Sequence, residues 1–502
     1  WNAGYIVTSG DNAYGMYAYD NSEIYNSYFS PNTIETFGDG SHGMVADMDS
    51  FAGNDDEIIT HGEGSFGMLA VNQSTANNAD VVRTGGAGSH GMVADGAGSV
   101  AHNNANVVTT GDGAFGMYAL NTGTVLNHAG GLVRTNGEGS HGMVADGTGS
   151  TATNEFGAEV RTTGPGSFGM LATGGSVATN LGRVVTTSDD SHGMYAFGGS
   201  TIYNTNAGDN RGVVRTEGAG SHGMVADGSG STAHVNSSNV VTNGDNSFGM
   251  YALNGGLVYN HFGGLVRTNG TGSHGMVADG AGSRATNEGD ADVLTTGDGS
   301  FGMFATNGSE AENLGRVVTR GDGSHGMYAF GGSTVNNNGS GAVRTEGAGS
   351  HGMVADGAGS VANNRSSVLT IGDGSFGMYA LDGGEVINRY GATIRTDGMN
   401  SHGMVAQGAG AIATNETEAN IRTTSDDAYG MYALDGALAR NSGTITTLGD
   451  SSHGMVAENG SGDPDDPDSG AYNNEMIVTS GDGSYGMYAL NSSRVDNYDT
   501  IE

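Results

Sequence analysis

One short phrase repeats along the whole chain and constrains its fold more than any other feature. Its clearest form is residues 372–380, which read Gly-Asp-Gly-Ser-Phe-Gly-Met-Tyr-Ala. The Gly-Met pair occurs nineteen times. A regular interval of roughly 25 residues is typical of a solenoid, in which each repeat buries its core against its neighbours. The glycines of these pairs are Gly15, Gly43, Gly67, Gly91, Gly116, Gly142, Gly169, Gly193, Gly223, Gly249, Gly275, Gly302, Gly326, Gly352, Gly377, Gly403, Gly430, Gly454 and Gly486.

The residues ahead of each Gly-Met pair predict a first short strand. Nine positions before the Gly stands Val or Ile in every repeat, and seven positions before it stands Thr. The residue between them varies, as Val108 and Arg134 show. Side chains alternate between the two faces of a strand. We therefore expect the constant Val or Ile and the Thr to point inward and the variable residue to point outward.

A turn and two further strands complete the repeat. The third residue before Gly-Met is Gly, Asn, Asp or Ser, residues common in tight turns; Asn246 is one example. Met and Ala are constant in the next strand, so Met378 and its counterparts are expected to line the core. A third strand ends in Asn in most repeats, and stacked Asn side chains can hydrogen-bond along such an axis. Asn127, Asn260 and Asn388 are predicted members of this ladder.

Three strands and three turns in about 26 residues predict an all-β fold, a parallel β-helix (β-solenoid) of about nineteen coils. We expect one continuous solenoid over residues 1–502, complete in itself or part of a longer chain. Residues 459–470 lengthen one repeat and are expected to form a protruding acidic loop.

The sequence also has a second, longer period that spans several coils. Residues 191–201 reappear unchanged at 324–334. Residues 131–137 reappear at 264–270, at the same distance along the chain. We call this distance in sequence the block shift. Five coils thus form a block that has been duplicated. On such a chain we expect functional features to be repeated rather than built once.

Composition argues against several classes of function. The net charge is −37, with 54 acidic residues against 17 basic ones, all Arg. Nucleic acid and anionic membranes are therefore poor partners. The absence of Cys removes disulfides and thiolate sites. No stretch approaches 18 apolar residues, so this segment is not expected to insert into a membrane.

The repeated phrase, followed by Ser-x-Val-x-Asn and [Val/Ile]-x-Thr-x-Gly, resembles β-helix repeats of bacterial autotransporter passenger domains and large surface adhesins. The resemblance covers essentially the whole chain. It implies a right-handed parallel β-helix, secretion across an outer membrane, and a location on the bacterial cell surface or outside the cell. It also implies a C-terminal membrane barrel, which we do not expect within residues 1–502.

Histidines and aromatic residues share the position just before Gly-Met. Their order suggests either a metal ladder or a stacked column of rings that packs a corner. Because the two residue types mostly alternate, most His would lie two coils apart, and we favour the stacked column. Ten of the fifteen His stand there: His42, His90, His141, His192, His222, His274, His325, His351, His402 and His453.

Acidic residues form two further rows. Thirteen repeats carry Asp or Glu four positions before Gly-Met, such as Asp112 and Asp373, and six end the second strand in Asp, such as Asp146. Rows of carboxylates could bind Ca²⁺, whereas solvated turn residues are the simpler interpretation. The weak candidate calcium ligands are Asp463, Asp465, Asp466 and Asp468 in the 459–470 loop. No other cofactor is predicted.

These observations favour a non-enzymatic, structural or adhesive β-solenoid outside the cell, forming a stiff rod or a fibre. No catalytic residue is assigned, because every carboxylate considered belongs to a repeated row. The expected partners are other copies, joined end to end or laterally, or other cell-surface components. The alternative is a β-helix that binds or cleaves polysaccharides, which a groove with aromatic residues and two carboxylates would favour.

Overall fold

The computed structural model is an all-β chain and describes residues 1–27, 32–206, 212–460 and 470–502. It divides into two compact units, unit 1 (Trp1–Met250) and unit 2 (Tyr251–Glu502). Each unit is a parallel β-helix whose coils carry three short strands, as the repeat predicted. None of the described residues belongs to a helix that could cross a membrane.

Unit 1 contains three parallel sheets, each built from one strand of every coil. The first sheet consists of β1 (Ile6–Thr8), β4 (Thr33–Thr36), β7 (Glu57–Thr60), β10 (Val81–Thr84), β13 (Asn106–Thr109), β16 (Leu132–Thr135), β19 (Glu159–Thr162), β22 (Arg183–Thr186), β25 (Val213–Thr216) and β28 (Asn239–Thr242). The second sheet consists of β2 (Met16–Tyr19), β5 (Met44–Asp47), β8 (Met68–Val71), β11 (Met92–Asp95), β14 (Met117–Leu120), β17 (Met143–Asp146), β20 (Met170–Thr173), β23 (Met194–Phe197) and β26 (Met224–Asp227). The third sheet consists of β3 (Glu23–Asn26), β6 (Phe51–Asn54), β9 (Thr75–Asn78), β12 (Val100–Asn103), β15 (Thr124–Asn127), β18 (Thr151–Asn154), β21 (Val177–Asn180), β24 (Thr201–Thr205) and β27 (Thr232–Asn236).

Unit 2 repeats this organisation. Its first sheet consists of β31 (Leu265–Thr268), β34 (Asp292–Thr295), β37 (Arg316–Thr319), β40 (Ala342–Thr345), β43 (Ser367–Thr370), β46 (Thr393–Thr396), β49 (Asn420–Thr423), β52 (Thr444–Thr447) and β55 (Ile477–Thr479). Its second sheet consists of β29 (Met250–Leu253), which begins at the last residue of unit 1, β32 (Met276–Asp279), β35 (Met303–Thr306), β38 (Met327–Phe330), β41 (Met353–Asp356), β44 (Met378–Leu381), β47 (Met404–Gln407), β50 (Met431–Leu434), β53 (Met455–Glu458) and β56 (Met487–Ala489). Its third sheet consists of β30 (Leu257–Asn260), β33 (Arg284–Asn287), β36 (Glu310–Asn313), β39 (Thr334–Asn337), β42 (Val361–Asn364), β45 (Glu385–Asn388), β48 (Ile412–Asn415), β51 (Leu438–Asn441), β54 (Gly470–Asn473) and β57 (Val495–Asn497).

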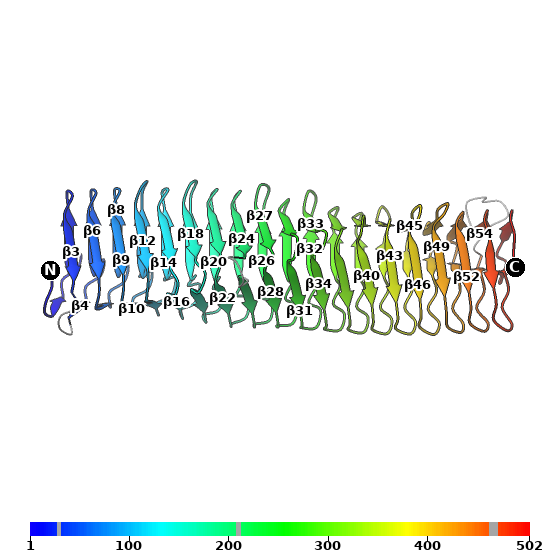
Figure 1. The fold of residues 1–502 in the computed structure, drawn as a ribbon, viewed down its shortest axis with the longest axis horizontal. Helices are drawn as coiled ribbons and strands as arrows, with labels where there is room; N and C mark the ends of the chain where they lie inside the picture. Colours follow the sequence, from blue (N-terminus) through cyan, green and yellow to red (C-terminus); the bar gives the residue numbers. More distant parts are fainter. Residues whose placement is uncertain (28–31, 207–211, 461–469) are drawn as a thin grey trace. The chain divides into compact units, whose positions relative to one another are not determined.

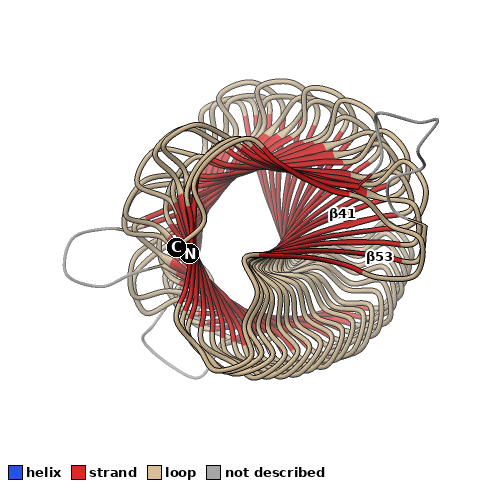
Figure 2. Cartoon of the chain, turned by 90° about the vertical axis from the view of Figure 1, so that its right-hand side faces the viewer, coloured by secondary structure: helices blue, strands red, loops and turns tan. Residues whose placement is uncertain are grey.

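Strands of successive coils pair in register, so that equivalent residues of neighbouring coils lie opposite each other. Met353 lies opposite Met378, and Ala355 lies opposite Ala380, where β41 pairs with β44. Within each unit the coils follow one another side by side, as the strands of Figure 1 show. Viewed along the coils, the chain bends inward before the second strand, and strands such as β41 and β53 then run outward from the middle (Figure 2).

The core consists of the side chains that the alternation placed inside. The repeated Met residues have 0% exposure in seventeen coils, Met378 among them, and only Met16 and Met487 are partly exposed. The inward Thr also loses its contact with water, so its hydroxyl needs a partner. It finds one across the turn, where Thr370 Oγ1 donates to the carbonyl of Ser375 at 2.9 Å. The predicted inward positions are therefore confirmed.

The glycine of the Gly-Met pair marks a close approach between coils. A Cβ added to Gly377 would lie 2.2 Å from Ile394 Cγ2 and 2.5 Å from the carbonyl oxygen of Gly403, both in the next coil. Real Cβ atoms do not come this close to other atoms, so any larger residue would push the coils apart. Sequence periodicity revealed this glycine but not the reason for it. The turn three residues earlier does adopt the expected left-handed conformation, with φ of 53° at Asn246 and Asp427.

The buried Asn residues form the predicted ladder inside each unit. In unit 1 the Nδ2 of each Asn donates to the Oδ1 of the next from Asn2 to Asn204, as Asn103 does to Asn127 at 2.8 Å. In unit 2 the ladder runs from Asn260 to Asn497. Asn127, Asn260 and Asn388 all belong to it, which confirms their assignment. Unit 1 has one exception, because Val235 lies opposite Asn204 and cannot continue the series.

Replacing one ladder residue by the Val found at position 235 is expected to destabilise unit 2. Asn313 donates to Asn337 and Gly315 and accepts from Asn287, and all of these bonds disappear in Asn313→Val. The loss of buried hydrogen bonds should lower the free energy of unfolding by roughly 1–3 kcal/mol, measured by urea denaturation. Asn336→Val, on the outer face of β39, serves as the matched control, because its side-chain hydrogen bonds with Glu310 and Asn363 are only partly buried. Equal losses in the two variants would show that the ladder does not stabilise the fold.

Candidate binding sites on the outer faces

The ten His before Gly-Met lie in a largely half-buried column of stacked rings, which confirms the favoured interpretation. The ring of His351 lies 4.6 Å from that of Phe376, with 16° between their planes. The backbone N–H of Phe376 also donates to His351 Nδ1 at 2.9 Å. All ten His accept such a bond from the next coil, so each ties two coils together. The sequence did not reveal this role.

Burial keeps these imidazoles neutral. It lowers the pKa of His141, His192 and His325 to about 4, against an ordinary value of 6.5. Tyr residues of the second sheet cover the column, some edge-on and others face to face. The ring of Tyr379 lies edge-on at 5.2 Å from that of Phe376, whereas the ring of Tyr328 stacks on Phe301 at 4.8 Å. This outer layer of rings buries even outward-pointing Val residues, and Val354 keeps 1% exposure. Strand alternation alone would have left that position facing water.

The repeated acidic residues bind neighbouring coils of the protein. Asp112 Oδ1 accepts the backbone N–H of Glu138 at 2.9 Å, and Asp373 accepts that of Met399. At the end of the second strand, Asp146 accepts the hydroxyl of Tyr118 at 3.0 Å. Among the described residues, no group of three or more His, Asp or Glu is arranged to hold a metal ion. The candidate calcium ligands Asp463, Asp465, Asp466 and Asp468 lie outside the described residues.

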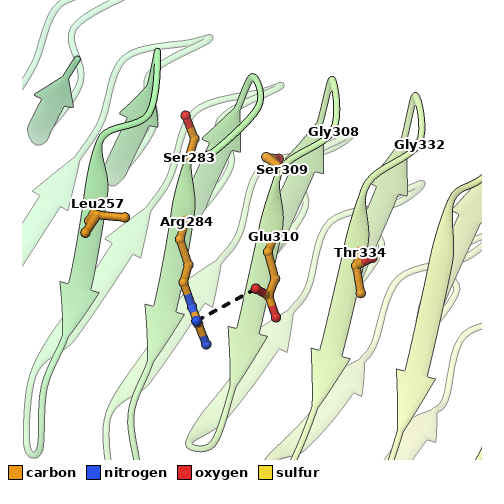
Figure 3. A pocket seen from close by; sticks show the side chains of 9 residues that line it. Leu257, Ser283, Arg284, Gly308, Ser309, Glu310, Gly332 and Thr334 are labelled. Atoms are coloured by element: carbon orange, nitrogen blue, oxygen red, sulfur yellow. Dashed lines mark ion pairs between the residues drawn. The ribbon is translucent and has the colours of Figure 1, made fainter. Parts of the chain in front are cut away.

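A charged cluster on the outer face of the third sheet lies in a surface pocket of about 580 Å³. Figure 3 shows Arg284 of β33 and Glu310 of β36 pointing toward each other there. Arg284 Nη1 lies 3.8 Å from Glu310 Oε2, and Nη2 contacts Glu312. We call this site the Arg284 pocket; its lining residues are Leu257, Gly282, Ser283, Arg284, Gly308, Ser309, Glu310, Gly332 and Thr334.

Two properties distinguish the Arg284 pocket from the repeated rows. First, Arg284 Nε is buried and has no hydrogen-bond partner among the described residues, so one donor of the guanidinium is unsatisfied. Second, the duplicated block does not repeat the cluster. At the block shift, Thr151, Val177 and Thr179 stand in place of Arg284, Glu310 and Glu312. The view that every carboxylate belongs to a repeated row therefore does not hold for Glu310 and Glu312.

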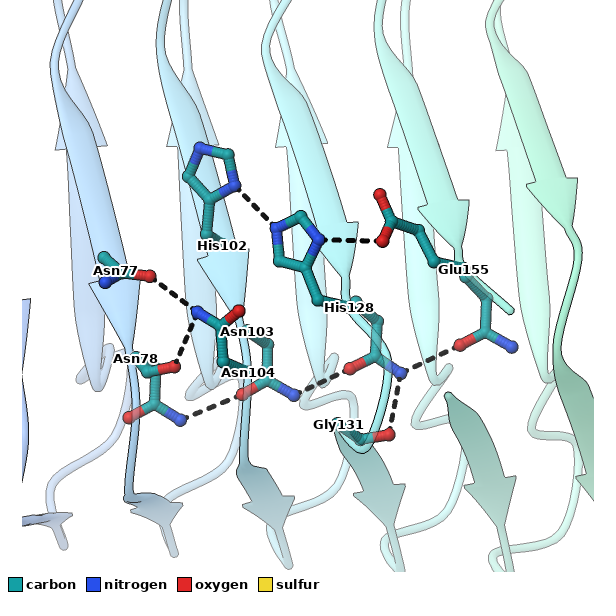
Figure 4. A network of polar contacts seen from close by, with 10 residues as sticks. Asn77, Asn78, His102, Asn103, Asn104, His128, Gly131 and Glu155 are labelled. Atoms are coloured by element: carbon teal, nitrogen blue, oxygen red, sulfur yellow. Dashed lines mark hydrogen bonds and ion pairs between the residues drawn. The ribbon is translucent and has the colours of Figure 1, made fainter. Parts of the chain in front are cut away.

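A chain of polar contacts crosses three coils of unit 1, from His102 on the outer face of β12 to the corners that follow β15 and β18 (Figure 4). His102 Nδ1 lies 2.8 Å from His128 Nε2, and His128 Nδ1 lies 2.9 Å from Glu155 Oε2. Because a carboxylate only accepts, the Nδ1 of His128 carries a proton and donates to Glu155. Burial and the neighbouring His128 lower the pKa of His102.

Equivalent coils of unit 2 carry a similar contact at the corner that follows the third sheet. His261 and Glu288 stand at the block shift from His128 and Glu155, and His261 Nδ1 lies 2.9 Å from Glu288 Oε2. Further along, Arg389 Nη1 lies 2.9 Å from Glu416 Oε1. A His or Arg side chain that contacts a Glu of the next coil therefore occurs three times at this corner. The recurrence of His128 and Glu155 at the block period is the sequence signal that could have revealed this corner.

Comparison with known proteins identifies the repeated block. Three successive segments, residues 125–264, 263–391 and 391–502, match the family described as the BigA third pectate lyase-like domain. These matches cover more than half of the chain. The chain belongs to this family. The match confirms the resemblance to surface β-helix repeat proteins. The first two segments each contain five Gly-Met pairs, as the block does, and the third contains four. We call them the first, second and third block.

The chain resembles a solved cryo-EM structure of the complex of Vag8 with C1 inhibitor, with 17% identity and a TM-score of 0.46. That similarity covers 97% of this chain and 100% of the other. Among curated proteins, none matches the chain.

Proposed function

We propose that this chain is a non-enzymatic, extracellular adhesive β-helix of a bacterial surface, and that the Arg284 pocket binds its partner. The observation that carries the proposal is the confinement of this charged cluster to one block. In the third block, Ile412, Leu438 and Arg440 stand in place of Arg284, Glu310 and Glu312. The rows that hold the coils together recur in all three blocks. A feature that the fold requires would recur with them.

The chemistry of the pocket suits a polar partner. Arg284 supplies donors, including the unsatisfied Nε, and the two carboxylates supply acceptors. The partner is a polymer of a cell surface or another copy of the chain. Such a site binds by hydrogen bonds and charge, with small flanking residues that let the partner approach the backbone.

The triple variant Arg284→Thr, Glu310→Val and Glu312→Thr tests the proposal. It installs the residues of the first block, so the fold is expected to persist, as circular dichroism can verify. Binding is measured to immobilised polygalacturonate, to peptidoglycan and to a second copy of the chain. We expect the unmodified chain to bind at least one of these and the triple variant to bind at least tenfold more weakly. Equal binding by both chains, or none by the unmodified chain, would contradict the proposal.

Polysaccharide cleavage is the second candidate, favoured by the pectate lyase-like family description and by two carboxylates beside Arg284, of which Glu310 lines the pocket. Incubation with polygalacturonate distinguishes the two functions. Release of reducing ends by the unmodified chain, but not by the triple variant, would replace the adhesive function by an enzymatic one.

A further inference from the structure

The outer face of the first sheet carries most of its arginines in ion pairs. Arg83 contacts Glu57 at 3.1 Å, Arg316 contacts Asp292 at 2.8 Å, and Arg344 contacts Glu346 at 3.0 Å. These pairs are what a chain with an excess of acidic residues is expected to form. They neutralise each guanidinium on the face where it lies.

Two places on this face depart from that rule. Arg134 of β16 lies directly opposite Arg161 of β19 in unit 1, and Arg395 of β46 lies directly opposite Arg422 of β49 in unit 2. All four side chains are exposed. Like charges directly opposite each other on paired strands are destabilising. Adjacent strands lie roughly 4.8 Å apart, so the two Arg residues of each pair are close neighbours.

Nearby carboxylates do not neutralise the Arg134–Arg161 pair. Arg134 Nε donates to the neutral amide of Asn136 at 3.0 Å. Glu159, on the same face as Arg161, contacts Arg183 at 3.6 Å instead. Within the described residues, Arg161 and Arg422 take part in no ion pair. In the Arg395–Arg422 pair, Arg395 Nε donates to Asp397 at 2.7 Å, so that pair is partly neutralised.

We propose that each pair binds a tetrahedral oxyanion, a sulfate or phosphate group, between its two guanidinium groups. Guanidinium groups present N–H donors in a fixed fork that matches such oxyanions. A dianion would neutralise both positive charges and remove the cross-strand repulsion. The group is either a free ion or a substituent of an anionic polymer. The pair in unit 1 binds more tightly, because Asn136 takes the place of the acidic Asp397.

The second block supplies a natural control. Leu294 occupies the position equivalent to Arg161, opposite Arg267 of the preceding strand. A leucine is therefore compatible with the fold at this place. Arg161→Leu and Arg422→Leu each remove one half of a pair without introducing a residue foreign to the repeat. Arg344→Leu removes an arginine that already has a carboxylate partner.

Equilibrium dialysis of radiolabelled inorganic sulfate, at constant ionic strength set with chloride, tests the proposal. The unmodified chain and Arg344→Leu should each bind two sulfates in a saturable manner. Arg161→Leu and Arg422→Leu should bind one each, and the double variant none. Asp397→Asn should raise the affinity of the weaker site toward that of the stronger. Sulfate binding that is unsaturable in the unmodified chain, or unchanged in the double variant, would overturn the proposal.

Dextran sulfate as a competitor distinguishes the two sources of the group. Displacement of bound sulfate by dextran sulfate at equal sulfate concentration would assign the site to a group on a polymer. Failure to displace it would assign the site to the free ion. Both results uphold the site, provided that the double variant has lost it. These measurements do not involve Arg284, so their outcome is independent of the proposed adhesive function.

Discussion

Acidification from about pH 7.5 to about pH 4 is expected to destabilise both units strongly, because ten neutral imidazoles lie in the stacked column. The pKa of His141 and His325 is lowered to about 4 in the folded chain, against 6.5 ordinarily. As the pH falls below 6.5 the unfolded chain binds these protons first. The contribution of the column to the free energy of unfolding is thus complete above about pH 6.5 and is lost as the pH falls toward 4. Each such His adds about 1.4 kcal/mol per pH unit to the dependence of the free energy of unfolding on pH between these two values.

Protonation also removes a hydrogen bond, since Nδ1 accepts the N–H of the next coil. Urea unfolding across this pH range measures the slope. His141→Phe, which installs the residue of the neighbouring coils, should reduce the proton uptake on unfolding by about one. Protonation of the many carboxylates acts in the opposite direction, because it relieves repulsion in a chain of net charge −37. An unchanged slope in His141→Phe would show that the column does not cause the acid sensitivity.

Met378→Asp is expected to cost several kcal/mol of stability, or to prevent unit 2 from folding. Met378 has 0% exposure and lies in register between Met353 and Met404, so a carboxylate there would be buried without a partner. Urea denaturation followed by circular dichroism measures the loss. Met378→Leu keeps the volume and apolar character and should cost less than about 1.5 kcal/mol. Similar stabilities for the Asp and Leu variants would contradict the buried Met column.

The core could be predicted from the sequence because the fold repeats the same environment in every coil. Met378 and Asn127 occupy fixed offsets from Gly-Met, and strand alternation then assigns their direction. The burial of Val354 could not be predicted in this way, since it depends on rings from neighbouring coils that cover the outer surface. The same holds for the hydrogen bond accepted by His351. It requires the position of an amide in the next coil, which no spacing within one repeat specifies.

The candidate binding site was harder to predict for the opposite reason. Periodicity directs attention to what recurs, and Arg284, Glu310 and Glu312 do not recur. Arg284 lies one coil before the two carboxylates, and the three residues meet only because adjacent coils pair in register. A comparison of the blocks with one another, in search of differences rather than similarities, would have found them. His128 and Glu155 required the reverse comparison, since their positions are kept at the block period.

The Asn ladder has a consequence for how the chain reaches its fold. Each of its hydrogen bonds joins residues 24 to 32 positions apart, in the first coils of a unit as in the last. The chain entropy lost in closing a coil grows only with the logarithm of loop length, and here that length is nearly constant. Every contact is local on the scale of the whole sequence, so the relative contact order falls as coils are added. A further five-coil block would extend the protein without requiring any longer loop to close, and folding that starts in one coil can spread to its neighbours.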